Sequence, residues 1–278
     1  SPKEKVKPME KQDKPQILLT NDDGIHSPGL WAAAEALSSL GYVHVVAPRE
    51  QYTSTGRSLP YDSDGIITPQ KLIVHGKEWT VFGVGGSPAQ TVLHGMLEIM
   101  QHKPDLVVSG INYGENIGSG VTVSGTIGAA LEAATLGLPA LAVSLQTDPK
   151  DHFSLSKDVD FSVAAHFTQL FAGKLLHKKM PFDVDVIKVD VPKDATLETQ
   201  WVVTRQSRAR YFHPLPTQRT NLETPGKMHY EIRLDLDNPE EDSDVQAVLI
   251  DRLVSVTPLS FDLTSRIDPK ELLKLLNS

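Results

Sequence analysis

The stretch Ile17-Leu18-Leu19-Thr20-Asn21-Asp22-Asp23-Gly24 decides the fold. Its apolar run predicts a buried parallel strand, and Gly24 predicts the turn by which the chain leaves the sheet. Ser27-Pro28 follows, a capping residue and then a proline at the first position of a helix. Asp22 and Asp23 are therefore expected just beyond the carboxyl end of a strand, where open α/β sheets bind ligands.

Composition limits the classes of function. The 278 residues are 40% hydrophobic and 22% charged, with a net charge of −8 and no cysteine. The negative charge argues against bulk nucleic-acid binding but leaves room for a nucleotide monomer in a locally positive pocket. The lack of cysteine excludes disulfides, thiolate metal sites and a Cys nucleophile. We find no apolar run near the roughly 20 residues of a membrane span and no secretory signal, so we expect a cytoplasmic protein without a membrane partner.

Strands and helices alternate from Gln16 to about Leu145. This alternation predicts right-handed crossovers and an α/β fold with a Rossmann-like, doubly wound, mostly parallel sheet. The expected strands are Ile17–Thr20, Val43–Ala47, Leu106–Ser109, Ala140–Leu145 and Val184–Val191, with a hairpin of Ile66–Val74 and Trp79–Val84. The expected helices are Gly29–Leu40, Ser87–Met100, Ser124–Leu136 and Phe161–Leu176, and a Gly/Asn loop is expected over Gly110–Gly120.

The pattern divides the chain into three parts. Residues 1–15 are rich in Lys, Glu and Pro and are expected to be a disordered extension, residues 16–204 a Rossmann-like catalytic core, and residues 205–278 a C-terminal extension. The later strands are predicted at Thr199–Thr204, His229–Asp235 and Ala247–Val256, the last two as a β-hairpin, with turn-rich segments at Pro214–Pro225 and Asn238–Asp244. A short terminal helix is predicted at Pro269–Leu276.

Three further loops fall at carboxyl ends of predicted strands or at a helix start. They are Tyr52–Gly56, which is rich in hydroxyls, Ser109–Gly114 with Asn112, and Ser124-Gly125-Thr126. Converging with the two carboxylates, a hydroxyl and an amide oxygen make an all-oxygen site that suits Mg²⁺, Mn²⁺ or Ca²⁺. Ser124-Gly125-Thr126 offers backbone N–H groups, hydroxyls and a helix dipole to an anion. Each loop also has a plain structural interpretation as a turn or a helix cap.

Five stretches in order resemble the SurE family of stationary-phase survival proteins: Leu18–Ile25, Val45–Pro48, Gly86–Pro88, Pro104–Asn112 and Val123–Thr126. Ser255–Leu259 also resembles the end of the family's chains. The resemblance implies a metal-dependent nucleoside monophosphate phosphatase with a Rossmann-like core and a C-terminal extension that swaps between subunits. It implies a divalent metal held by Asp22, Asp23, Thr53 and Asn112. Family members usually have serine at the position of Thr53, and the adjacent Ser54 is the alternative hydroxyl ligand.

We therefore expect a metal-dependent phosphomonoesterase that hydrolyses nucleoside monophosphates. Asp22 and Asp23 would be catalytic as well as metal-binding, with one Mg²⁺ or Mn²⁺ ion, or Ca²⁺ in a crystal. The expected phosphate-binding residues are Asn21, Ser124, Gly125 and Thr126. A homodimer or homotetramer is expected because an isolated hairpin is marginal in water. An arginine cluster is a candidate either for contacting a substrate phosphate or base across the subunit boundary or for a solvated or subunit-contact role: Arg205, Arg208, Arg210 and Arg219.

Two other classes of function fit parts of the pattern. A non-catalytic module that binds a metal and a nucleotide would use the same loops. A phospho-receiver domain also has paired acids after its first strand, but it would be near half this length and carry a lysine after a late strand. The strand Ala140–Leu145 runs instead into Gln146-Thr147-Asp148.

Overall fold

The computed structural model describes residues 14–74, 76–152, 154–233 and 239–278. Apart from residues 14 and 15, the extension expected over residues 1–15 lies outside this range, as do Leu234 and Asp235 of a predicted strand. No helix in the described part of the chain is long and apolar enough to cross a membrane.

Among the described residues, nine strands form one sheet in the order β3-β4-β2-β1-β5-β6-β7-β11-β8. All neighbouring strands from β4 to β7 in this order are parallel to each other. At the two ends of this parallel part, β3 runs antiparallel to β4, and β11 runs antiparallel to β7. The predicted α/β class with a mostly parallel sheet is confirmed. The strands are β1 (Gln16–Thr20), β2 (Tyr42–Pro48), β3 (Ile67–Val74), β4 (Lys77–Val84), β5 (Leu106–Tyr113), β6 (Ala140–Leu145), β7 (Val186–Val191), β8 (Trp201–Val203) and β11 (Val254–Leu259).

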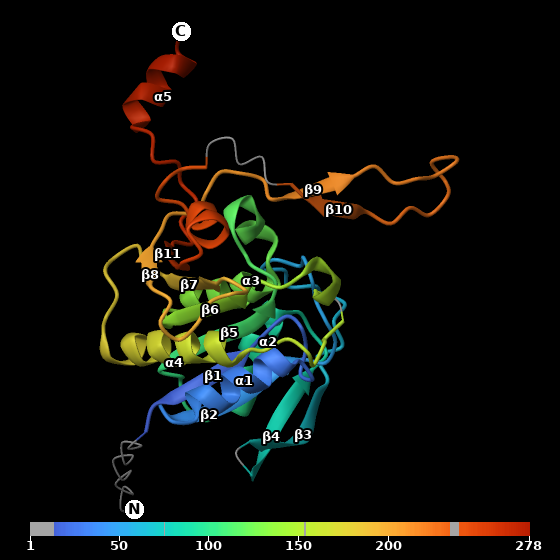
Figure 1. The fold of residues 1–278 in the computed structure, drawn as a ribbon, viewed down its shortest axis with the longest axis vertical. Coiled ribbons are helices and arrows are strands. Elements are labelled where there is room, and N and C mark those ends of the chain that lie inside the picture. The colour runs from blue at the N-terminus through green and yellow to red at the C-terminus, as the bar shows by residue number, and fades with distance from the viewer. Residues whose placement is uncertain (1–13, 75, 153, 234–238) are drawn as a thin grey trace, which may run out of the picture.

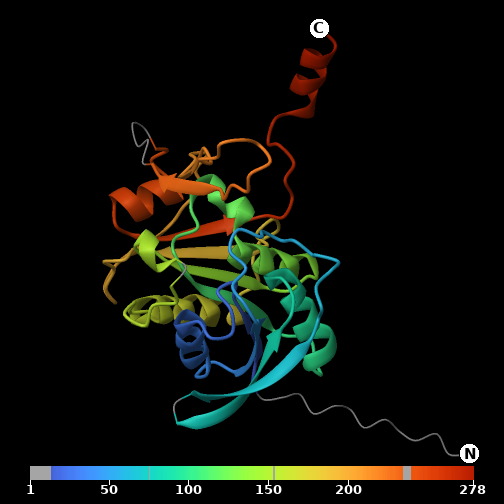
Figure 2. The same cartoon turned by 90° about the vertical axis from the view of Figure 1, so that its right-hand side faces the viewer.

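Helices cover both faces of this sheet (Figures 1 and 2). Helices α1 (Pro28–Leu37) and α4 (Ser162–His177) pack on one face, and α2 (Pro88–His94) and α3 (Gly125–Thr135) pack on the other. Alternate residues of β1 enter the two cores, with Ile17 and Leu19 in one and Leu18 in the other. This double burial is the reason that β1 reads as a continuous apolar run.

Two predicted elements of the core have different ends in the structure. The helix predicted over Ser87–Met100 is α2, opened by a capping box between Ser87 and Gln90, followed by a π-helical turn at Gly95–Ile99. The strand predicted to end at Ser109 continues to Tyr113, with a shift of register against β6 between Ser109 and Asn112. Asn112 therefore lies in a strand, and the Gly/Asn loop predicted from Gly110 begins later than expected.

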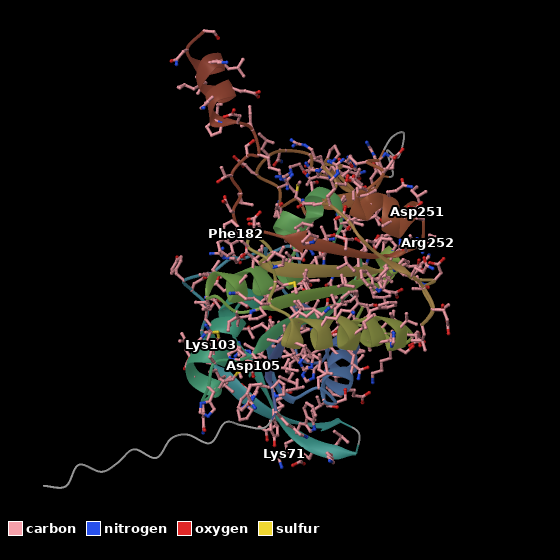
Figure 3. The ribbon with its side chains drawn as sticks, turned by 90° about the vertical axis from the view of Figure 1, so that its left-hand side faces the viewer. Lys71, Lys103, Asp105, Phe182, Asp251 and Arg252 are labelled. Carbon is pink, nitrogen blue, oxygen red and sulfur yellow. The ribbon has the colours of Figure 1, made fainter. Side chains whose placement is uncertain are left out.

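The strand predicted over Ala247–Val256 is wrong for its first part, and only Val254–Val256 lie in a strand. Gln246–Ile250 forms a π-helical turn, followed by β11 in the main sheet. Val245 and Val248 bury their side chains in a separate small core with Ile117 and Tyr211. A short apolar run fits a buried helical turn as well as a strand, and for this reason the sequence pattern predicted a strand where a turn forms. Arg252, labelled in Figure 3, closes the turn by donating from Nη1 to the Val248 carbonyl at 2.8 Å.

The C-terminal hairpin has a different partner strand from the predicted one. Strand β10 (His229–Ile232) pairs antiparallel with β9 (Phe212–Leu215), part of which was predicted to be turn. This two-stranded arm projects from the body, and helix α5 (Pro269–Leu276) stands apart from it at the other side (Figure 1). The terminal helix is confirmed, and all of its residues are exposed. The swap between subunits stays a prediction.

Candidate active site

The carboxyl ends of β1, β2 and β5 and the start of α3 open onto one cavity of about 450 Å³. This volume is within the range of small-molecule sites. The structure brings together several residues that were selected from the sequence, and the C-terminal arm closes one side of the same cavity. The selected residues that line it are Asp22, Asp23, Thr53, Ser54, Asn112 and Ser124, and the arm residues are Phe212, Pro214 and Tyr230.

Asp22 lies against the N-terminus of α3. The hydroxyl of Thr126 donates to Asp22 Oδ1, and a Cβ built on Gly125 would lie 2.8 Å from the Cβ of Asp22. Only a glycine at position 125 lets this carboxylate approach the helix so closely. The backbone N–H of Tyr52 donates to the Asp22 carbonyl at 2.8 Å, which brings the hydroxyl-rich loop to the same place.

Asp23 is held by two donors from other elements. The backbone N–H of Tyr113 donates to Oδ2 at 3.1 Å, and Gln51 Nε2 donates to Oδ1 at 3.1 Å. Gln51 Nε2 also donates to the His152 carbonyl at 2.9 Å. The second donation joins the segment after β6 to the carboxylate. Both carboxylates are thus fixed in place by residues from outside β1.

The two carboxylates repel each other in a buried site. Burial raises the pKa of Asp22 to about 6, against the hydrogen bond from Thr126. Burial, and then the charge of Asp22, raise the pKa of Asp23 well above its ordinary value. Among the described residues, neither carboxylate forms an ion pair with Lys, Arg or His. A bound cation would offset this charge, so the site fits a metal held by oxygen.

Neutral oxygens complete the candidate ligand set. Asn112 Nδ2 donates to the Gly114 carbonyl at 2.7 Å, which leaves its Oδ1 as the ligand atom. Thr53 and Ser54 are exposed and both line the cavity, and Ser54 has a φ of 60°. Within the described residues, no group of three or more His, Cys, Asp or Glu side chains is placed to hold a metal. Two carboxylates with neutral oxygens are therefore the candidate site that these residues offer.

Some of the predicted phosphate-binding residues line the cavity, and others are fully buried. Ser124 lines the cavity and caps α3, with its Oγ accepting from the Ile127 N–H at 3.2 Å. Thr126 is fully buried and its hydroxyl is used by Asp22. Asn21 is also fully buried; its Nδ2 donates to the Gly24 carbonyl at 3.0 Å and its Oδ1 accepts from the Gly24 N–H at 3.2 Å. Phosphate binding by Asn21, Ser124, Gly125 and Thr126 stays a prediction.

Sequence reasoning missed residues that only the fold brings to the cavity. Burial raises the pKa of Glu115, whose Oε1 accepts from the Tyr211 hydroxyl, and burial lowers the pKa of His152. Phe212 packs edge to face against Tyr230 with ring centroids 5.3 Å apart. Neither ring carried a sequence signal. Of the four clustered arginines only Arg210 lines the cavity, and it does so within the same chain.

Comparison with known proteins identifies the family. The family model described as "Survival protein SurE" matches residues 17–213. The 5'-nucleotidase SurE of Thermococcus gammatolerans is 42% identical over 263 residues, which cover 94% of this chain and 96% of that protein. The 5'-nucleotidase SurE of Archaeoglobus fulgidus is 42% identical, covering 91% and 94%. The crystal structure of the SurE protein from Aquifex aeolicus superposes with a TM-score of 0.72 at 33% identity and covers 95% of this chain and 100% of that chain. The chain belongs to the SurE family.

Proposed function

We propose that the protein is a metal-dependent phosphomonoesterase that hydrolyses nucleoside monophosphates to nucleoside and phosphate. The observation that carries this proposal is the pair of buried carboxylates, Asp22 and Asp23, next to the N-terminus of α3 in one cavity. A cation site beside an anion site suits a phosphate ester. Family membership supports it, because the relatives that match nearly the whole chain are named 5'-nucleotidases.

The metal would be one divalent ion held by Asp22, Asp23, Asn112 and a hydroxyl of Thr53 or Ser54. We favour Mg²⁺ or Mn²⁺, because these ions take oxygen ligands. Such an ion, when bound, would supply Lewis-acid polarisation of the phosphoryl oxygen and acidify a water molecule.

The remaining steps belong to side chains and backbone of this chain. The carboxylates of Asp22 and Asp23 would orient the attacking water and accept its proton. The Ser124 hydroxyl and the first N–H groups of α3 would hold phosphate oxygens as charge develops. Thr126 would fix Asp22 in position through its hydroxyl.

The test is release of inorganic phosphate from AMP by the purified full chain. We expect turnover with Mg²⁺ or Mn²⁺, none in EDTA, and recovery when metal is added back. Undiminished turnover in a metal-stripped sample would overturn the metal requirement. Binding of AMP by calorimetry without turnover under any metal would instead support the non-catalytic binding module.

Assembly and location are also proposals. A homodimer or homotetramer is supported by α5, whose Leu272, Leu273, Leu275 and Leu276 are 43–75% exposed and belong to no hydrophobic core formed by the described residues. A second subunit can bury such a face. The cytoplasmic location stays a prediction from composition.

A further inference from the structure

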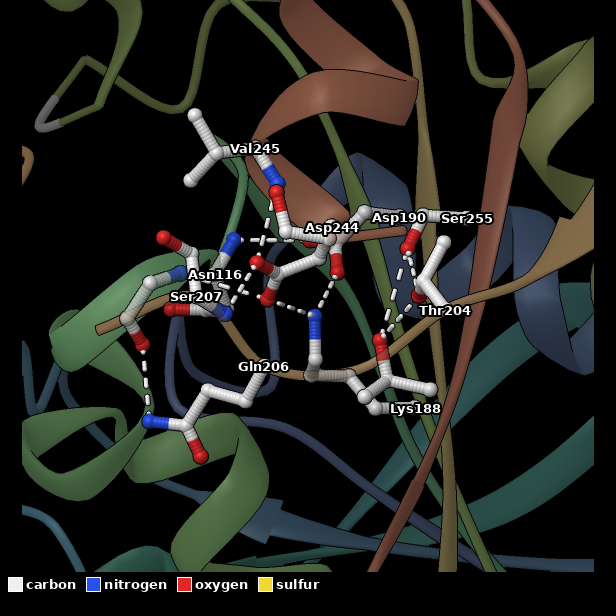
Figure 4. Close-up of polar contacts among 12 residues, drawn as sticks. Asn116, Lys188, Asp190, Thr204, Gln206, Ser207, Asp244, Val245 and Ser255 are labelled. Carbon is white, nitrogen blue, oxygen red and sulfur yellow. Dashed lines mark hydrogen bonds and ion pairs between the residues drawn. The ribbon is translucent and has the colours of Figure 1, made fainter. Parts of the chain in front are cut away.

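Lys188 is fully buried in β7 between two buried carboxylates (Figure 4). Its Nζ lies 2.5 Å from Asp190 Oδ2, on the same strand, and 3.1 Å from Asp244 Oδ2, from the C-terminal part of the chain. Burial alone would lower the pKa of Lys188, but the two carboxylates outweigh burial and raise it. Lys188 therefore stays charged, and it holds together two carboxylates that are 54 positions apart in sequence.

The same carboxylates accept backbone N–H groups from two segments. Asp190 Oδ1 accepts from Asn116 at 2.7 Å, and Asp244 Oδ2 accepts from Gly118 at 3.2 Å. Asp244 Oδ1 accepts from Ser207 at 2.9 Å. Asp244 thus uses one oxygen for each segment. We call Asn116–Gly120 and Ser207–Phe212 together the cavity wall.

The two halves of the cavity wall contact each other directly. The Ser119 N–H donates to the Ala209 carbonyl at 2.9 Å. Gly118 has a φ of +58°, and a Cβ on it would lie 2.6 Å from the same carbonyl, so only glycine fits. A Cβ on Gly120 would lie 3.6 Å from the Phe212 ring. A shift of either half therefore moves the other.

The cavity wall contains none of the residues that hold the two carboxylates proposed to be catalytic. Asp22 and Asp23 are held by Thr126, Tyr113 and Gln51, and none of these three residues belongs to the cavity wall. Five residues of the cavity wall line another part of the cavity: Asn116, Ser119, Gly120, Arg210 and Phe212. If the phosphate occupies the end at Asp22 and Asp23, the nucleoside meets this wall, where an aromatic ring suits stacking on a base.

We call Lys188, Asp190 and Asp244 the ion cluster. A gain in folding stability does not by itself explain why these three charged side chains are buried together. Replacing a buried ion pair by apolar side chains of similar volume is often neutral or stabilising, whereas fixed carboxylates impose a specific geometry on the donors around them. Here those donors are the backbone N–H groups of Asn116, Gly118 and Ser207.

We propose that Lys188, Asp190 and Asp244 are positioning residues that hold the cavity wall in the shape that binds the nucleoside half of the substrate. The inference rests on the proposed function. It separates the site into a phosphate end built by the parallel strands and a nucleoside end whose geometry depends on the cluster. Damage to the cluster should therefore affect binding of a nucleotide more than binding of a phosphate ester without a base.

The test compares Asp244→Asn with wild type on AMP and on ribose 5-phosphate, with saturating metal. Asparagine keeps the shape but has one acceptor oxygen, so it cannot accept from both Gly118 and Ser207. We expect the KM for AMP to rise about tenfold, the KM for ribose 5-phosphate to stay within about twofold, and kcat for both to change little. The matched control is Asp242→Asn, which removes an exposed carboxylate paired with Arg205 at 2.6 Å and should change neither KM.

A second readout does not use activity. Hydrogen exchange of residues 114–123 should be faster in Asp244→Asn, while β1 stays protected as in wild type. If wild type does not hydrolyse AMP, the proposed function fails, and exchange still tests the positioning role. The double variant Lys188→Gln/Asp190→Asn, which removes one charge of each sign, is measured in parallel. Equal KM changes for both substrates, no KM change, unchanged exchange, or failure of both variants to fold would overturn the inference.

Discussion

Replacing Asp22 by asparagine should stabilise the metal-free protein while abolishing its activity. In the metal-free fold Asp22 is buried beside Asp23, and burial raises its pKa from the ordinary 3.8 to about 6. Asparagine keeps an oxygen that accepts from the Thr126 hydroxyl. It removes the charge that opposes ionisation of Asp23. The substitution therefore relieves repulsion without leaving a cavity.

The magnitude follows from linkage between proton binding and folding. A carboxyl whose pKa is raised in the folded state favours folding most at low pH, where it is protonated in both states. That contribution is lost as the pH rises through about 6, because the unfolded chain ionises first. The change from 3.8 to about 6 corresponds to about 3 kcal/mol of unfolding free energy. For a chain of this size the Asp22→Asn variant should melt roughly 6–12 °C above wild type at about pH 8.

The assay is thermal unfolding by circular dichroism in EDTA at about pH 4 and about pH 8. The difference in Tm between variant and wild type should be large at the higher pH and several times smaller at the lower one, where the unfolded carboxyl is only partly ionised. Asp148→Asn is the control, since Asp148 is exposed and a hydrogen bond from Lys193 lowers its pKa, so no gain is expected. A variant that melts below wild type at about pH 8, or with the same difference at both pH values, would refute the reasoning.

Three other expected outcomes can be measured directly. Asp23→Asn should lower kcat for AMP by orders of magnitude with an unchanged circular dichroism spectrum, and normal turnover would contradict the assignment. Thr126→Val should lower kcat by about tenfold or more, since a hydrogen bond to a charged group is worth about 1.5–3 kcal/mol. Thr126→Ser, which keeps the hydroxyl, should keep most of the wild-type kcat. Equal losses of kcat in the two variants would argue against a role for the hydroxyl. Deleting residues 266–278, which include α5, should reduce the oligomer size in sedimentation with little loss of Tm, and an unchanged sedimentation coefficient would rule out α5 as the contact.

The end of the candidate site that holds Asp22 and Asp23 could be predicted because local sequence positions it. Asp22 and Asp23 follow an apolar run that is buried on both faces, and parallel strands bring their carboxyl ends to one edge. Asn112 was found by the same rule and Ser124 by its place at a helix start, and both line the cavity. The role of Thr126 was not predictable, because a hydroxyl at a helix start turns toward a neighbour only when that neighbour is in place.

The C-terminal part was predicted less well for a physical reason. The run around Val248 has the same apolar character whether it forms a strand or a buried turn, and contact with Ile117 and Tyr211 decides between them. Strand β10 pairs with β9, part of which lies in a proline-rich segment that was predicted to be turn. Tertiary contacts made these choices.

The sequence by itself determined the α/β class, the central parallel strands and the place of the two carboxylates, because the apolar period and the turn residues act over a few positions. Only the tertiary structure decided which side chains hold those carboxylates and which segments close the cavity. Gln51, Tyr113 and the pair Lys188–Asp244 act across long separations in sequence. No local pattern records such pairings, since hydrogen bonds and buried charges between distant segments exist only after the sheet has formed.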